Sequence, residues 1–146
     1  MSVVASSTVA SLSPTAEVEA KLKLWKALNE EIQTLYTQKT QSLSQFNENT
    51  LVKGELDLLS KEEEGESSVF KLIGPVLVAV ELEGAKENVA KRLEFIESEI
   101  QRLDAAIESK QAVQKTLGDE IAAAQSKVAA DAAEEARKVV KEVTAR

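Results

Sequence analysis

Few residues in this 146-residue chain have side chains suited to catalysis. The chain has no cysteine and no histidine, which removes thiol nucleophiles, imidazole bases, disulfides and the usual ligands of zinc or copper. Its five glycines are too widely spaced to form a phosphate-binding loop or a dinucleotide-binding fingerprint. The carboxylates and lysines that remain lie on segments that offer no cleft. We therefore expect a protein that is not an enzyme and has no cofactor.

An acidic run is the one candidate for a cation site. Residues 61–68 read Lys-Glu-Glu-Glu-Gly-Glu-Ser-Ser. Their spacing does not match that of a calcium-binding loop, and a run of charges is usually a solvated connector. We interpret this segment as an acidic linker and expect no metal site.

Charge and composition exclude several classes of partner. The formal charge of -7 and the absence of a basic cluster argue against nucleic acid. No apolar run approaches the roughly 20 residues that cross a bilayer, so we expect no membrane partner. Residues 1–13 have the features of neither a secretory signal nor a transit peptide, and we expect a disordered leader on a cytoplasmic protein.

Elongated helices are the fold that the apolar residues favour. Aromatic residues make up only 3% of the chain, too few for a typical globular core, while Ala, Leu, Val and Ile recur at helical spacing. A first helix is predicted over residues 14–60, beginning after Ser13. Its heptad seam comprises Val18, Leu22, Trp25, Asn29, Ile32, Tyr36, Lys39, Leu43, Phe46 and Thr50. Leu28 and Leu35 flank this seam, and the apolar residues later shift phase to Val52, Leu56 and Leu59.

A second helix is predicted over residues 81–128. Its seam comprises Val89, Leu93, Ile96, Ile100, Leu103, Ile107, Lys110, Gln114, Leu117, Ile121, Ala124 and Val128. The tail 129–146 is open to two interpretations, a continued helix or disorder. If it is helical, we expect Val128, Ala132, Val139 and Val143 to be apolar positions without a partner on the first helix.

Folding the chain back at Gly74 sets the register of the two seams. Trp25 then faces Leu117, and Phe46 faces Ile96. The same register places Asn29 opposite Gln114, and we hypothesise that a hydrogen bond between them fixes the register at some cost in stability. The alternative is that both side chains turn to solvent where the seam loosens.

The segment between the helices is an apolar strip, residues 69–80, with Gly-Pro at its centre. Its β-branched residues predict a two-stranded hairpin. Two strands alone are rarely stable in water, so we expect this hairpin to pair with strands of other subunits. The alternative is a loop packed on the helix ends.

Residues 69–78, followed by residues 85–96, resemble the β-type subunits of prefoldin. Residues 46–56 are similar to the end of the first helix in that family. The resemblance is strong over residues 43–100 and a matter of pattern elsewhere. Two features depart from the family: Ala79-Val80 replace an expected polar pair, and the acidic linker is long. Both departures touch the edge that faces neighbouring subunits.

The resemblance implies a mainly α fold: an antiparallel two-helix coiled coil whose central β-hairpin joins a multi-subunit β-barrel. It implies a heterohexamer of α-type and β-type prefoldin subunits. Such a hexamer captures unfolded clients, such as actin and tubulin, at the coil ends. It passes them without ATP to the cytosolic group II chaperonin.

Two sets of site residues follow from the resemblance. Subunit assembly falls on Val69, Phe70, Leu72, Ile73, Val76, Leu77 and Val78, and client binding falls on Val18, Leu22, Leu24, Trp25, Leu28, Leu117, Ile121 and Val128. Trp25 has an alternative role as simple seam packing. The rival function is a structural coiled-coil scaffold or tether, which explains the heptads but not a hairpin that demands partners.

Overall fold

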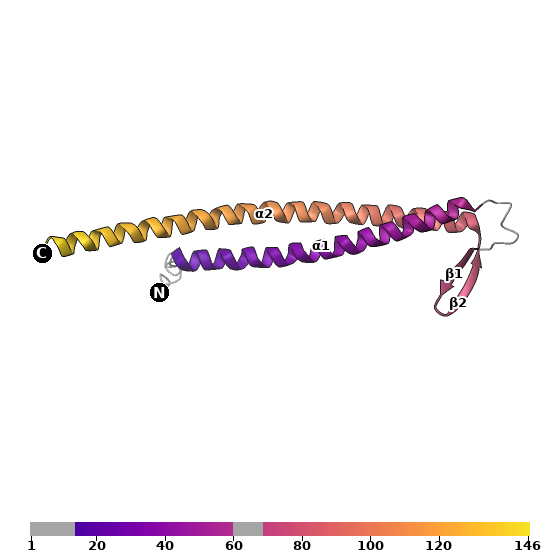
Figure 1. The fold of residues 1–146 in the computed structure, drawn as a ribbon, viewed down its shortest axis with the longest axis horizontal. Coiled ribbons are helices and arrows are strands. Elements are labelled where there is room, and N and C mark those ends of the chain that lie inside the picture. The colour runs from indigo at the N-terminus through magenta and orange to yellow at the C-terminus, as the bar shows by residue number, and fades with distance from the viewer. Residues whose placement is uncertain (1–13, 60–68) are drawn as a thin grey trace, which may run out of the picture. The chain divides into compact units, whose positions relative to one another are not determined.

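The chain forms two long helices separated by one hairpin. The computed structural model describes residues 14–59 and 69–146. In chain order the elements are α1 (Pro14–Leu58), β1 (Val69–Ile73), β2 (Val76–Val80) and α2 (Leu82–Thr144) (Figure 1). The predicted fold class, mainly α with a central antiparallel hairpin, is confirmed. The leader at 1–13 and the acidic linker at 61–68 lie outside the described residues.

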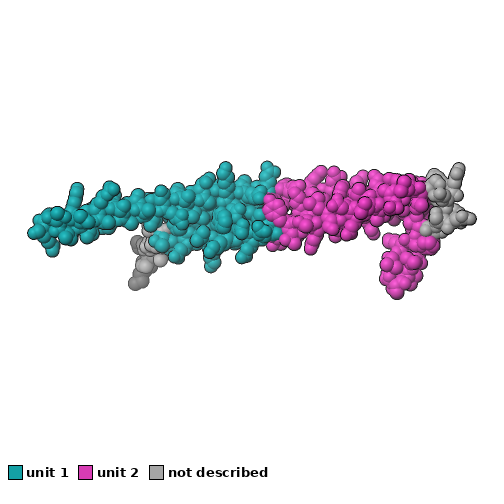
Figure 2. Space-filling view, in the orientation of Figure 1, with its two compact units in different colours: residues 1–33, 108–146 teal, residues 34–107 magenta. Residues whose placement is uncertain are grey.

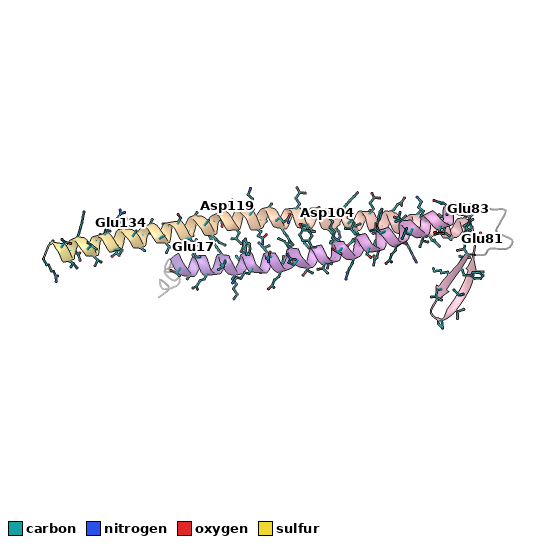
Figure 3. All side chains as sticks on the ribbon, viewed as in Figure 1. Glu17, Glu81, Glu83, Asp104, Asp119 and Glu134 are labelled. Carbon is teal, nitrogen blue, oxygen red and sulfur yellow. The ribbon has the colours of Figure 1, made fainter. Side chains whose placement is uncertain are left out.

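Local signals account for the helix ends. Proline is favoured at the first position of a helix, where its missing N–H costs nothing, and α1 begins at Pro14 with Glu17 in its first turn. The Glu81 carbonyl accepts a hydrogen bond from the Ala85 N–H at 2.9 Å, so Glu81 caps α2. Glu83 in the first turn of α2 and Lys141 in its last turn match the polarity of the helix dipole. Figure 3 marks Glu81 and Glu83 at this start of α2.

The chain divides into two compact units, coloured separately in Figure 2. One unit contains the described part of residues 1–33 together with 108–146, and the other lies within 34–107. Each unit contains a segment of both helices, and the second also contains the hairpin. We call them the terminal unit and the hairpin unit.

The core of the hairpin unit follows the predicted seam of the second helix. Leu56, Leu82 and Val89 form a buried cluster, against which Val69 of β1 and Leu59 pack. Further along α2, Ile96, Leu103 and Ile107 are also buried. Leu103 is the most enclosed, with 1% of its surface exposed. The phase shift at the end of α1 therefore directs Leu56 toward the base of the hairpin.

The terminal unit has a thinner core. Ile32 of α1 and Ile121 of α2 are buried, and the other seam residues are half-buried except Leu22, which is exposed. The tail is helical as far as Thr144, and Glu134 in Figure 3 lies on the stretch of α2 beyond the start of α1. Val128 is half-buried and lines a shallow groove with Thr15 and Val18, so the expectation that Val128 lacks a partner is wrong. Ala132 lines the same groove but is exposed, as are Val139 and Val143. The pairing extends one turn further than the sequence register suggested.

Candidate interaction surfaces

The hairpin is built around a two-residue turn. Strand β1 pairs antiparallel with β2, from Val69 opposite Val80 at the base to Ile73 opposite Val76 beside the turn. Gly74 has φ of 59°, and the following Pro75 cannot adopt a positive φ. This combination is that of a type II′ turn, whose twist matches that of the strands. The predicted strands are therefore present, and the alternative of a packed loop is wrong.

One face of the hairpin is entirely apolar, and the other is apolar apart from Lys71. One face carries Phe70, Leu72, Leu77 and Ala79, and the other carries Val69, Lys71, Ile73, Val76, Val78 and Val80. Val69 is half-buried, whereas the other six residues predicted for subunit assembly have between 40% and 67% of their surface exposed. An apolar surface of this kind on a small sheet marks an interaction site.

A second apolar surface lies beside the helix seam in the terminal unit. Leu24 and Leu28 of α1 approach α2 along a groove of about 530 Å³. Leu24 is 60% exposed and Val113 is 53% exposed. We call this surface the lateral groove, and its lining residues are Leu24, Leu28, Ala112, Val113, Thr116, Leu117 and Glu120.

Two ion pairs between the helices flank the lateral groove. Lys21 Nζ lies 3.6 Å from Glu120 Oε2, and Lys110 Nζ lies 2.5 Å from Glu31 Oε2. Lys21 and Glu120 occupy positions that flank the coiled-coil seam, where charged residues are usual, whereas Lys110 is itself a seam residue. Between the two pairs, Leu28 and Val113 occupy such flanking positions instead. The groove is therefore an apolar interruption in a charged border.

The eight residues predicted to bind clients divide into four groups. Leu24, Leu28 and Leu117 line the lateral groove, while Val18 and Val128 line the shallow groove one turn from the start of α1. Leu22 and Trp25 lie along the seam, and Trp25 Nε1 is 3.7 Å from the point where a side chain at Gly118 would begin. Ile121 is buried, so in this conformation it contributes packing rather than a contact surface.

Sequence reasoning missed part of the lateral groove. Ala112, Val113 and Thr116 line it but lie outside the a and d positions on which the seam was traced. The available signal was Val113, an apolar residue at a flanking position that directly precedes the seam residue Gln114.

The electrostatics of the two units are those of exposed helices. Arg102 Nε donates a hydrogen bond to Glu99 Oε2 at 3.2 Å, and this bond lowers the pKa of Glu99 and raises the pKa of Arg102. Over the described ranges 14–59 and 69–146, no cluster of three His, Cys, Asp or Glu side chains is arranged to hold a metal ion. Within the same ranges, neither helix is apolar enough over sufficient length to span a bilayer.

Two helices joined through an exposed apolar hairpin define a coiled-coil subunit with a strand pair available to other chains. A family model described as prefoldin subunit matches residues 19–128. The chain belongs to the prefoldin subunit family. This is a family of chaperone subunits that assemble with other prefoldin subunits.

Individual relatives agree with that assignment. The probable prefoldin subunit 6 of Caenorhabditis briggsae is 38% identical over 96 residues, which are 66% of this chain and 72% of that one. The prefoldin subunit 6 of Arabidopsis thaliana is 50% identical over 64 residues, 44% and 46% of the two chains. The prefoldin subunit 6 of Homo sapiens is 34% identical over 91 residues, 62% and 67% of the two chains. The predicted resemblance to prefoldin subunits is confirmed, and these relatives are all named as prefoldin subunit 6.

A solved structure shares the fold. The prefoldin beta subunit from Thermococcus strain KS-1 superposes with a TM-score of 0.67. The match covers 74% of this chain and 91% of that one at 19% sequence identity. The arrangement of helices and hairpin is therefore that of a prefoldin beta subunit.

Proposed function

We propose that this chain is a β-type subunit of a cytoplasmic, heterohexameric prefoldin, partnered by α-type and other β-type subunits. The hexamer captures unfolded proteins, such as actin and tubulin, at the ends of its coiled coils. It delivers them to the cytosolic group II chaperonin without ATP. In this role the chain is a binding component and performs no reaction of its own.

The lateral groove is the observation that supports client capture. Leu24 and Val113 expose apolar surface that the two helices do not need for their own packing. Apolar contact is non-directional, so such a surface holds many unrelated sequences weakly. Several arms acting together then convert weak contacts into useful avidity. A scaffold or tether would gain nothing from this surface, which favours the chaperone over the structural alternative.

Client capture is tested by introducing charged residues into the lateral groove of this chain within an assembled hexamer. Replacing Leu24 and Val113 by Glu should leave the subunit composition of the hexamer unchanged in native mass spectrometry. Suppression of the aggregation of denatured actin should fall severalfold, because burying a carboxylate against an apolar client is costly. The matched control is Leu51→Glu, which charges a leucine that is 71% exposed in the hairpin unit. Full suppression by the double variant would overturn the proposal for this groove.

The hairpin supports assembly. Its two faces are apolar apart from Lys71, and two strands by themselves are marginal in water, so partners from other subunits supply the missing burial. Placing Asp at Phe70 and Leu77 should abolish incorporation into a co-expressed hexamer, since both lie on the entirely apolar face. Phe95→Asp, on an α2 side chain that is 71% exposed, is the control. Normal hexamer yield with Asp at both hairpin positions would remove the hairpin as the assembly element.

Delivery to the chaperonin has its own test. A hexamer preloaded with labelled actin is mixed with purified group II chaperonin in the absence of nucleotide. The label should move to the chaperonin fraction on gel filtration. Retention of all the label on the hexamer would contradict ATP-independent delivery.

A further inference from the structure

Lys71 is the single charged residue among the ten residues of the two strands. It lies at the centre of β1, two residues from each end, and its partner on β2 is Val78. Among the described residues, no carboxylate forms an ion pair with it. A charge in the middle of an otherwise apolar strand is costly to bury without a counter-charge. Its presence therefore needs a reason beyond strand formation.

The open edge of β1 sets the geometry around Lys71. In the type II′ turn, Ile73 and Val76 form the hydrogen-bonded pair, and such pairs alternate along an antiparallel ladder. Lys71 therefore directs its backbone groups toward β2. The backbone groups of Phe70 and Leu72 point the other way, to the edge where a further strand would add.

Self-pairing along this edge brings two lysines together. Two copies of β1 that pair antiparallel over all five residues place the central residue of one opposite the central residue of the other. That residue is Lys71 in both copies, and the pair is of the non-hydrogen-bonded type, in which side chains lie closest. Like charges directly opposite on neighbouring strands are destabilising. Strand β2 has Val78 at its centre and carries no such charge.

We propose that Lys71 determines which neighbour the hairpin accepts: it blocks pairing between two copies of this chain through β1, and it favours a neighbouring subunit that presents a carboxylate opposite it. Lysine on an edge strand is a known means of preventing edge-to-edge association. The four-carbon stem also lets the ammonium reach across one strand spacing of about 4.8 Å. The inference rests on the proposed assembly through the hairpin.

A charge swap tests self-exclusion directly. Native mass spectrometry is used on the wild-type chain, on Lys71→Glu, and on an equimolar mixture of the two. In either chain alone, two like charges still face each other across the paired β1 strands, so self-association should remain weak. The mixture should form mixed pairs about fivefold more tightly than either chain pairs with itself, since a Lys now faces a Glu. Lys71→Val should self-associate more strongly than wild type, and Lys71→Arg should match wild type.

A cross-link reports the register of these mixed pairs. The chain has no cysteine, so Phe70→Cys in one chain and Leu72→Cys in the other introduce the only thiols. These positions face each other in the paired β1 strands, at the separation of about 5.5 Å that suits a disulfide. The disulfide should form in higher yield in the charge-swapped mixture than when both chains carry Lys71. The control is Lys53→Glu on α1, which makes the same charge change outside the hairpin.

The outcomes separate this inference from the proposed function. Wild type is co-expressed in parallel with α-type and other β-type prefoldin subunits. If wild type enters the hexamer while the Lys71 variants neither self-associate nor form mixed pairs, the inference is overturned and the proposed assembly stands. If wild type itself stays outside the hexamer, the proposed assembly is overturned first.

Discussion

Asn29 of α1 and Gln114 of α2 meet in the seam of the terminal unit. Gln114 Nε2 donates a hydrogen bond to Asn29 Oδ1 at 3.4 Å, and both side chains are half-buried. The alternative in which both turn to solvent is therefore not the arrangement found. A hydrogen bond of 3.4 Å is long and therefore weak. This agrees with a contact that favours one register of the two helices but adds little to their stability.

Replacing both residues by Leu should raise the free energy of unfolding by about 1–2 kcal/mol, because two half-buried amides give way to apolar contact. Thermal unfolding followed by circular dichroism measures the gain. Spin labels on the two helices should then report more than one register. An unchanged melting temperature together with a single register would remove the register hypothesis.

Gly118→Ala should stabilise the terminal unit by about 0.5–1 kcal/mol, since glycine is a poor residue within a helix. A methyl group there would lie 3.7 Å from Trp25 Nε1, an ordinary contact distance. Gly54→Ala on α1, where nothing lies within 4 Å, is the control for helix propensity alone. Denaturant titration measures both variants. If Gly118→Ala alone lowered the stability, Trp25 would have to pack too closely against residue 118 to admit a methyl group, which would contradict the prediction.

Gly74→Ala should act in the opposite direction. The turn needs a positive φ at this position, and a Cβ there costs about 1 kcal/mol or more although no neighbour obstructs it. The expected result is a lower yield of hexamer on co-expression, with the helix content unchanged. Wild-type yield from this variant would show that the hairpin tolerates another turn.

Leu103→Ala should destabilise the hairpin unit by about 2–5 kcal/mol, because the side chain is enclosed and its removal leaves a cavity. Phe95→Ala, eight residues away on the exposed face of α2, should change stability by less than about 0.5 kcal/mol. Chemical unfolding of the two variants gives the comparison. Equal losses would contradict the seam assignment on α2.

Arg102→Gln should raise the pKa of Glu99 toward its ordinary value. The side-chain hydrogen bond from Arg102 holds the pKa of the folded state down, so any stabilisation from the pair is present at neutral pH and is lost as pH falls through that lowered pKa. Carbon-detected NMR of the carboxyl group across the acid range measures the shift. Arg102→Lys, which keeps the charge but not the forked geometry, should give an intermediate rise.

Seam packing accounts for what sequence reasoning predicted well. Buried positions such as Ile32, Leu103 and Ile121 fall on the predicted heptads, because burial along a helix pair follows the 3.5-residue repeat. The hairpin was predictable for an equally local reason, since β-branched residues flank a Gly-Pro turn. The resemblance to prefoldin subunits rested on this same region.

The lateral groove was not predictable in the same way. It depends on which flanking positions of the two helices meet, because Leu28 and Val113 lie on different helices and neither is a seam residue. The continued pairing of Thr15 and Val18 with Val128 and Ala132 has the same origin.

Spacing along the chain predicts the element types, the seams and the approximate register, because each of these is a repeating pattern in one chain. Which apolar residues the helices leave exposed depends on the tertiary structure. Exposure of Leu24, and enclosure of Ile121 close by in the same unit, result from how the two helices meet. The spacing of residues within one helix does not determine where the other helix lies.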